Sequence, residues 1–220
     1  KNINKNFADK CIIRDFSIQI KRGDRIGIVG PNGIGKTTLL KILLGEVQPD
    51  IGEIKLGSNL IIAKFDQMRE QLILENSILQ NLTDDPNIQS SGKAGQIIAR
   101  GKPKHVTGYL KEFLFSEVQL RAPVKSLSGG EKARLLLAKI MAKESNLLIL
   151  DEPTNDLDLE TLDLLQEVIA EYPGTVLLIS HDRDFLNRTV ETSIILTGQG
   201  KFLKIAGSWN DYQSLKIENT

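Results

Sequence analysis

The stretch Gly30-Pro31-Asn32-Gly33-Ile34-Gly35-Lys36-Thr37-Thr38 decides the fold of this chain. It fits the pattern G-x-x-x-x-G-K-[ST], whose glycines let backbone N–H groups approach phosphates without a Cβ in the way. The apolar run Ile26–Val29 before it predicts a buried strand, and Lys36–Leu44 after it predicts a helix that Gly45 ends. The positive N-terminal end of such a helix favours a bound anion. This strand, loop and helix therefore predict a nucleotide-phosphate site.

Two side chains of this loop have predicted roles. Lys36 can reach the β- and γ-phosphates, and the Thr37 hydroxyl can be a ligand of Mg²⁺. By chance, the whole pattern arises in on the order of one percent of chains of this length, and its place between a strand and a helix lowers that figure further.

A pair of carboxylates follows a second apolar run, Leu147–Leu150. A buried strand of this kind delivers Asp151 and Glu152 to the carboxyl edge of a sheet, where ligand sites of α/β proteins lie. Asp151 is predicted to hold Mg²⁺ through its water shell, and Glu152 to orient and deprotonate the attacking water. The alternative, that Asp-Glu-Pro simply begins a loop, loses weight because the phosphate loop is present.

A second anion site is predicted at Leu127-Ser128-Gly129-Gly130-Glu131. A serine hydroxyl, glycine amides and a helix N-terminus meet there. One nucleotide does not need two such sites from one chain, so this one is predicted to serve a nucleotide held by a partner. An ordinary N-cap at Ser128 is the alternative.

Taken in order, these segments and Ser180-His181-Asp182 resemble the ATP-binding cassette (ABC) family over nearly the whole chain. The resemblance implies ATP and Mg²⁺ as ligands and two ABC domains that enclose two ATPs head to tail. It makes Gln67 the Q-loop residue that contacts Mg²⁺ or the attacking water, and His181 the switch residue at the γ-phosphate. It places Phe7 at the adenine ring, where a buried strand-start phenylalanine is an equal alternative. Ser-His-Asp is not a hydrolase triad, because sequence neighbours cannot adopt that geometry.

The expected fold is α/β, a P-loop NTPase of ABC type with an antiparallel β subdomain and a helical subdomain. Strands alternating with helices predict a parallel sheet covered on both faces. One ABC domain is expected over 1–220: a β subdomain and phosphate loop at 1–69, a helical subdomain at 70–135, and the remaining half of the core at 136–220. Strands are further expected at Phe16–Ile20, Glu53–Leu56, Leu60–Phe65 and Thr175–Ser180, helices at Val106–Phe115, 131–142 and Leu159–Glu171, and a hairpin at Ile194–Thr197 and Phe202–Ile205.

Several segments are similar to the ABC-F branch, whose members are soluble and carry two ABC domains on one chain. Glu131 stands where transporters usually carry Gln, and the second acid motif continues Pro153-Thr154-Asn155-Asp156-Leu157-Asp158. Segments 101–115 and 207–212 also fit this branch. The inter-motif segment is too short for the helical arm of first domains, so the chain is interpreted as an excised second domain.

The ABC-F resemblance implies a cytoplasmic protein whose parent contacts the ribosome, RNA or DNA. The ATP-binding subunit of a transporter is the alternative function. The partner is a second ABC domain, on the same parent chain or in a head-to-tail homodimer.

The composition of the chain limits its possible partners and its cellular compartment. The 220 residues carry 28 Lys+Arg and 28 Asp+Glu, so net charge does not indicate a polyanion partner. A single cysteine fits a reducing compartment, and no apolar run has the length of a membrane span. One basic cluster is predicted either to touch nucleic-acid phosphates or, as the favoured alternative, to be solvated: Arg100, Lys102, Lys104, His105 and Lys111.

Overall fold

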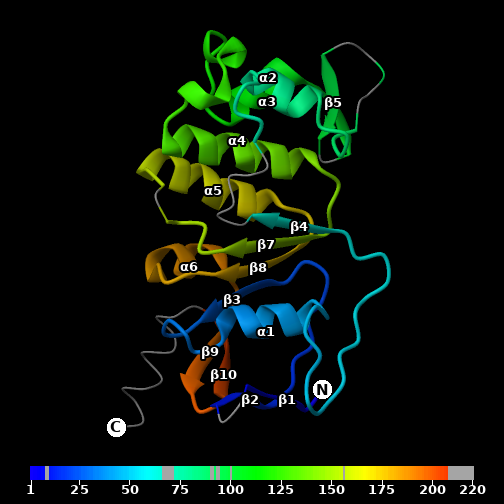
Figure 1. Ribbon diagram of the computed structural model, residues 1–220, viewed down its shortest axis with the longest axis vertical. Coiled ribbons are helices and arrows are strands. Elements are labelled where there is room, and N and C mark those ends of the chain that lie inside the picture. The colour runs from blue at the N-terminus through cyan, green and yellow to red at the C-terminus, as the bar shows by residue number, and fades with distance from the viewer. Residues whose placement is uncertain are drawn as a thin grey trace. The chain divides into compact units, whose positions relative to one another are not determined.

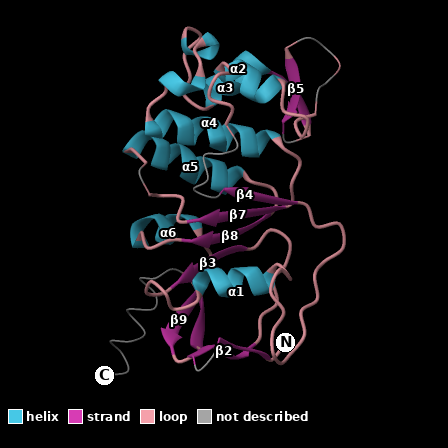
Figure 2. Cartoon of the chain, viewed as in Figure 1, coloured by secondary structure: helices cyan, strands magenta, loops and turns pink. Residues whose placement is uncertain are grey.

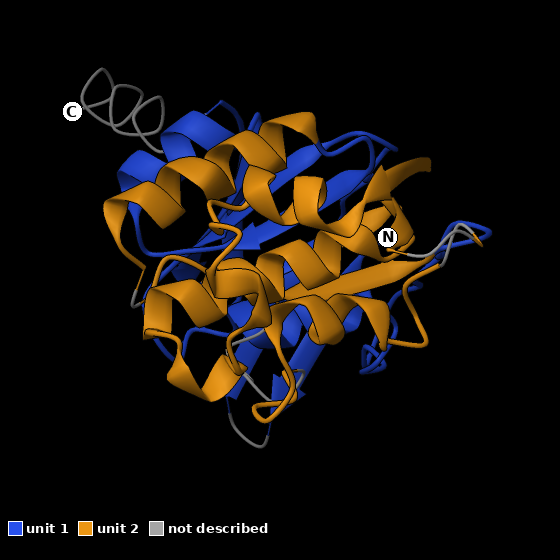
Figure 3. Ribbon diagram, turned by 90° about the horizontal axis from the view of Figure 1, so that it is seen from above, with its two compact units in different colours: residues 1–60, 149–152, 172–220 blue, residues 61–148, 153–171 orange. Residues whose placement is uncertain are grey.

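The computed structural model describes residues 1–7, 10–65, 72–89, 92, 95–99, 101–155 and 157–207. The chain divides into two compact units, coloured separately in Figure 3. Unit 1 comprises residues 1–60, 149–152 and 172–220, and unit 2 comprises residues 61–148 and 153–171. These units interleave along the sequence, so the division into 1–69, 70–135 and 136–220 stays a prediction.

Unit 1 is built on a sheet in which parallel and antiparallel strands meet (Figure 1). β3 (Arg25–Val29) lies between β8 (Thr175–Ile179) and β9 (Thr192–Gly198) and is parallel to both. β10 (Lys201–Ala206) pairs antiparallel with β9. β8 is buried along its whole length, as apolar strands of covered parallel sheets are. α1 (Lys36–Leu43) and α6 (Arg183–Thr189) follow β3 and β8.

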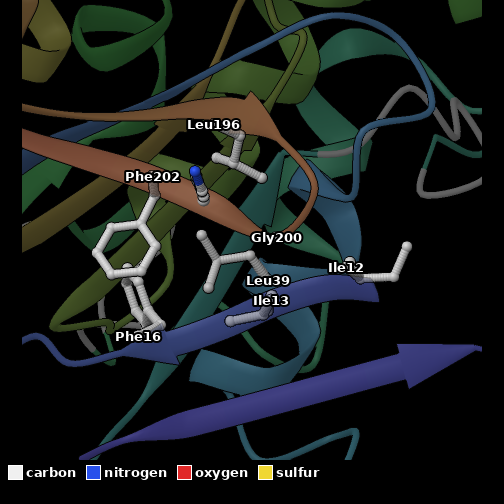
Figure 4. Close-up of a pocket in the computed structure, with 8 residues that line it drawn as sticks. Ile12, Ile13, Phe16, Leu39, Leu196, Gly200 and Phe202 are labelled. Atoms are coloured by element: carbon white, nitrogen blue, oxygen red, sulfur yellow. The ribbon is translucent and has the colours of Figure 1, made fainter. Parts of the chain in front are cut away.

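A two-stranded antiparallel sheet, β1 (Ile3–Phe7) with β2 (Lys10–Phe16), begins the chain. Its inner side chains pack against the β9–β10 hairpin in the small apolar pocket of Figure 4, where Phe16 and Phe202 meet edge to face at 4.4 Å. Leu39 of α1 lines the same pocket. This packing fixes the first sheet beside the helix that follows the glycine loop.

Unit 2 contains four α-helices among its described residues, drawn in cyan in Figure 2. They are α2 (Ile78–Thr83), α3 (Val106–Glu112), α4 (Gly129–Ala142) and α5 (Leu159–Glu171), with short 3₁₀ turns at Gln119–Arg121 and Val124–Ser126. β4 (Ile62–Phe65) begins the unit, and β5 (Gln96–Ala99) pairs antiparallel with β6 (Lys102–His105). β7 (Leu147–Asp151) starts in unit 2 and ends in unit 1.

The expected α/β fold is confirmed, and most expected elements occur within a residue or two of their bounds. Two expected strands were wrong. β2 ends at Phe16, so Phe16–Ile20 is not a strand, and residues 53–56 have no strand and are mostly exposed. The β5–β6 hairpin was not foreseen inside a segment interpreted as helical. Within the described part of the chain, no helix is both long enough and apolar enough to cross a membrane.

Candidate functional site

The glycine loop of unit 1 joins β3 to α1 as predicted. Gly35 is the N-cap residue of α1, with φ 116°, and a Cβ at this position would come within 2.4 Å of Ile12 Cγ2. Both the backbone conformation and the close approach require glycine. Since glycine has no side chain to cap the helix, the first amides of α1 stay available to an anion.

Lys36 is the first residue of that helix and is only 8% exposed. Its Nζ donates to the carbonyl oxygens of Gly30 (2.8 Å) and Pro31 (3.3 Å) and lies 3.0 Å from Nε2 of His181. Burial lowers the pKa of the Lys36 ammonium, while the charges of Glu152 and Asp151 act in the opposite direction. The loop lysine and both predicted acids therefore share one electrostatic environment.

Glu152 follows β7 in a left-handed backbone conformation, φ 48°, which is uncommon for a residue with a Cβ. Its N–H donates to the carbonyl of Ile179 at the end of β8 (2.8 Å). The side chain lies against His181: Oε1 is 3.0 Å from Nε2, and Oε2 accepts the backbone N–H at 3.2 Å. Strained backbone of this kind is frequent at functional sites.

Lys36 and Glu152 require opposite protonation of Nε2 of His181. A protonated Nε2 donates to Glu152, whereas a deprotonated Nε2 accepts from Lys36. In the second case Oε1 of Glu152 is buried without a hydrogen-bond donor. A further polar ligand at this point would resolve the conflict, which is the behaviour expected of a binding site and not of a finished ion-pair network.

The oxygen donors near the loop suit Mg²⁺. Thr37 is exposed and Asp151 is half-buried. Among the residues that the structure describes, no group of three or more His, Cys, Asp or Glu side chains could hold a metal. Mg²⁺ is usually held by one or two carboxylates together with waters and substrate phosphates, and Asp151 with the Thr37 hydroxyl would offer oxygen ligands of that kind.

The β1–β2 sheet reaches the glycine loop through Lys10, whose Nζ donates to the Gly33 carbonyl at 3.1 Å. Phe7 is the register partner of Lys10. The Phe7 ring is 50% exposed, with the Lys5 ammonium 5.3 Å from its centroid. An exposed ring near the loop can stack on a base, so the adenine role of Phe7 stays a prediction. No sequence motif indicated Lys10.

Ser180 and Asp182 have local structural contacts. The Ser180 hydroxyl accepts the N–H of Asp182 (3.0 Å), and Asp182 caps α6 by accepting the N–H of Phe185 (2.9 Å). These contacts support the prediction that Ser-His-Asp is not a triad.

The second predicted anion site lies in unit 2, at the N-terminus of the 14-residue helix α4. Ser128 and Glu131 form a capping box: the Ser128 hydroxyl accepts the N–H of Glu131 (3.2 Å), and Glu131 Oε2 accepts the N–H of Ser128 (2.8 Å). The other oxygen, Oε1, accepts from Nε2 of Gln119 at 2.7 Å. Ser128 and Gly129 are exposed, so the N-cap role is compatible with binding at this helix end.

Gly130 is closely covered by the start of α5. A Cβ at Gly130 would come within 2.8 Å of Oδ2 of Asp158, whose Oδ1 caps α5 by accepting the N–H of Thr161 (2.8 Å). A side chain at residue 130 would therefore have to displace the Asp158 carboxylate that caps α5.

Part of the predicted site cannot be placed. Gln67, Arg100, Asp156 and residues 208–220 lie outside the described residues.

In the basic cluster, Lys104 pairs with Glu112 (2.6 Å) and Lys111 with Glu117 (2.5 Å). The cluster therefore carries less unbalanced positive charge than its sequence suggests.

Comparison with known proteins identifies the family. The family model described as "ABC transporter" matches residues 13–155. The chain belongs to the ABC family. As an ABC domain it is an ATP-binding ATPase domain, which confirms the predicted enzyme class.

Its ABC relatives agree with the predicted branch. The ATP-binding protein Uup of Caulobacter vibrioides is 50% identical over 211 residues, which cover 96% of this chain and 34% of that protein. Uup of Escherichia coli is 50% identical over 202 residues, 92% of this chain and 31% of that protein. The energy-dependent translational throttle protein EttA of Haemophilus influenzae is 37% identical over 216 residues, 98% of this chain and 37% of that protein. The chain spans about a third of the length of these relatives.

Solved structures of ABC proteins share the fold. CbiO1 of Clostridium perfringens, part of the transporter complex cbiONQ, aligns with a TM-score of 0.73 at 24% identity, covering 98% of this chain and 90% of that one. A dimeric, post-hydrolysis ATP-binding cassette, MJ0796 with ADP and Pi, aligns with a TM-score of 0.66 at 24% identity, covering 94% and 97%.

Proposed function

We propose that this chain is the ATP-hydrolysing domain of a Mg²⁺-dependent ABC-F clamp, in which ATP closes two ABC domains and hydrolysis opens them. One observation carries the proposal. Nε2 of His181 lies 3.0 Å from Nζ of Lys36 in the glycine loop and 3.0 Å from Oε1 of Glu152 after β7. A phosphate-binding cation, a hydrogen-bonding switch group and a candidate base thus meet within unit 1.

The loop and its neighbours have complementary tasks in this proposal. Backbone amides at the start of α1 and the Lys36 ammonium bind the phosphates. Thr37 and Asp151 are the residues that would hold Mg²⁺, which neutralises charge developing on the phosphate oxygens. Phe7 would stack on adenine, and the ABC resemblance assigns Gln67 the contact to the metal or to the attacking water.

Glu152 is the general base of the proposed reaction. Its carboxylate accepts the proton of the attacking water, and His181 hydrogen-bonds the γ-phosphate. Nε2 of His181 cannot donate to Glu152 and accept from Lys36 at the same time. We therefore expect phosphate binding to replace the Lys36–His181 contact.

The signature segment of unit 2, Ser128 to Glu131, is proposed to act on an ATP held by a second ABC domain. Its exposed serine and glycine begin a helix whose positive end suits a phosphate. The partner domain belongs to the same parent chain or to a second copy arranged head to tail. The chain itself is proposed to be a second domain, as its sequence indicates.

For the cellular role we favour a cytoplasmic protein that acts on the ribosome. Support comes from the relative named as a translational throttle protein, which is 37% identical. A DNA-linked role and a transporter subunit are the alternatives, and they predict different partners for the ATP-loaded state.

The test is Glu152→Gln in the full-length protein that contains this chain, together with the matching change in any second ABC domain. The amide cannot accept the proton, so we expect turnover to fall about 100-fold or more while ATP stays bound. Sedimentation with ribosomes, with and without ATP, follows the trapped state. ATP-dependent pelleting supports the ribosome role, and ATP binding without pelleting contradicts it.

A matched control is Glu191→Gln, an exposed glutamate of the same unit. It removes the same charge away from the glycine loop, and turnover should be that of the wild type. Wild-type turnover in Glu152→Gln itself would refute the base role.

A further inference from the structure

We propose that Gln119 is a positioning residue for the signature segment, acting through Glu131 on Ser128. This inference rests on the proposed function of that segment. Gln119 lies nine residues before Ser128, outside every motif of the sequence. It begins the short 3₁₀ turn Gln119–Arg121 in unit 2.

A relay of hydrogen bonds connects Gln119 to the serine. Nε2 of Gln119 donates to Oε1 of Glu131 (2.7 Å), and Oε2 of Glu131 accepts the N–H of Ser128 (2.8 Å). The N–H of Glu131 returns to the Ser128 hydroxyl at 3.2 Å. Both carboxylate oxygens of Glu131 are thus engaged, which fixes the rotamer of a side chain that would otherwise be mobile.

The orientation of the Gln119 amide is set at its other end. Oε1 of Gln119 accepts from both the N–H (3.0 Å) and the hydroxyl (2.9 Å) of Ser116. A backbone N–H can only donate, so the oxygen must face Ser116 and the nitrogen must face Glu131. The neighbouring Phe115 is 2% exposed, which anchors the start of this segment in the core.

The relay determines what the Ser128 hydroxyl can do. Its oxygen uses an acceptor lone pair for the N–H of Glu131, so its own proton remains available to donate. A hydroxyl held by its cap and exposed at the start of a helix is suited to donate to a phosphate oxygen. If Glu131 were free to change rotamer, the Ser128 hydroxyl would still be present, but its position would be less well fixed.

The relay also explains why residue 131 is a glutamate in this chain. A glutamine there would have one oxygen and one NH₂ group to place between two donors, Nε2 of Gln119 and the N–H of Ser128. One of the two contacts would set donor against donor. Conversely, a glutamate at 119 would place its carboxylate against that of Glu131.

These constraints predict that an exchange of the two side chains restores the relay. With Q119E and E131Q together, the carboxylate at 119 accepts from Ser116 and from the new amide at 131. The oxygen of that amide accepts the N–H of Ser128. Every hydrogen bond keeps one donor and one acceptor, although the charge has moved from one position to the other.

The experiment measures kcat, KM and equilibrium ATP affinity of the full-length protein carrying Gln119→Glu, Glu131→Gln or both, with melting temperatures for each. Each single change should lower kcat about tenfold, the effect of one mispaired hydrogen bond at the part-buried Gln119–Glu131 contact. ATP affinity should stay within about twofold, because Lys36 and its loop lie in unit 1 and are untouched. The double variant should recover most of the lost kcat.

A second capping box in unit 2 supplies the matched control. Ser77 and Gln80 form the same reciprocal pair at the start of α2, with Gln80 Oε1 accepting the N–H of Ser77 at 2.9 Å. Gln80→Glu makes the same chemical change and preserves that pair, so kcat should be unchanged.

Single variants with wild-type kcat, or a double variant no better than either single one, would overturn the positioning role. A loss of kcat that merely follows lowered melting temperature would also overturn it. The proposed function fails separately: in that case Glu152→Gln leaves turnover intact. A normal loss in Glu152→Gln with wild-type behaviour of the Gln119 variants rejects only this inference.

Discussion

Two buried lysines of this ABC domain have opposite surroundings. Lys139 in unit 2 is 5% exposed and lies 3.1 Å from Asp85, which Lys143 also approaches at 3.2 Å. Lys36 in unit 1 is 8% exposed, but its Nζ contacts two backbone carbonyls and a histidine nitrogen. The first lysine has a carboxylate partner in direct contact, whereas the second shares its histidine with Glu152.

The difference separates a structural ion cluster from a binding site. A buried charge is stable in a fold when a counter-charge and hydrogen bonds satisfy it. Asp85 supplies both to Lys139. The groups around Lys36 leave a proton conflict that a phosphate would settle. We therefore expect changes at Asp85 to affect folding and changes at Lys36 to affect ligand binding.

The largest effect is expected for Asp85→Asn. Removing the carboxylate leaves two lysine ammoniums without their shared partner, which costs roughly 3 kcal/mol when such a pair is buried. Urea denaturation measures the loss of unfolding free energy. The adjacent, exposed Asp84→Asn should change it by less than about 0.5 kcal/mol. Equal losses in both variants would show that the Asp85 cluster is not structural.

The next effect is expected for Lys36→Ala. Loss of charge-assisted hydrogen bonds to the phosphates should weaken ATP binding about 10- to 100-fold, equivalent to roughly 1.5–3 kcal/mol. Isothermal titration with ATP measures it, and unfolding free energy without ligand should change much less. Lys41→Ala, at an exposed position of the same helix, is the control. Unchanged ATP affinity in Lys36→Ala would contradict the site.

Folding stability should depend on pH through the Asp85 cluster. Burial raises the pKa of Asp85, but hydrogen bonds from Asn87 and Lys139 and the charges of Lys139 and Lys143 outweigh it, so the pKa lies below its ordinary value. A lowered folded pKa gives stability that is complete above the unfolded value, about 4, and lost as pH falls through the folded pKa. Asp85→Asn should flatten this acid limb of the stability profile, and an unchanged limb would refute the assignment.

The smallest effect is expected for Lys143→Met. Its side chain is 24% exposed and is the second cation on Asp85, so its removal leaves the Lys139 pair intact. We expect a loss of at most about 1 kcal/mol in unfolding free energy. Lys139→Met, measured alongside, should cost more. The reverse order would show that Lys143 is the principal partner.

The sequence predicts well those elements whose signal is local. The run Thr175–Ile179 and the helix Leu159–Glu171 occur as expected because their burial follows from their own apolar pattern. The loop around Lys36 and the position of Asp151 and Glu152 at the end of β7 were likewise foreseen from local motifs and the apolar runs before them. These segments form the part of the candidate site that lies in unit 1.

Features that depend on distant partners were not predictable. No local pattern in the sequence marks Asp85 as an ion-pair partner, because its lysines lie more than 50 residues away, on α4 and just beyond it. Gln119 carries no motif, although the Ser128–Glu131 spacing alone indicates a capping box. The β5–β6 hairpin contains Pro103, a residue that argues against a strand. The false strand at Phe16–Ile20 follows Asp15, whose φ of 51° is not an extended conformation.

The left-handed backbone at Glu152 sets a trade-off between activity and stability at this single position. A φ near 48° costs most residues with a Cβ about 1 kcal/mol of conformational free energy, and asparagine adopts it more readily. A protein selected only for thermal resistance would therefore tend to replace this glutamate with Asn or Gly, and would lose the proposed base in doing so. At this position, a substitution that raises the melting temperature is therefore expected to lower ATP turnover.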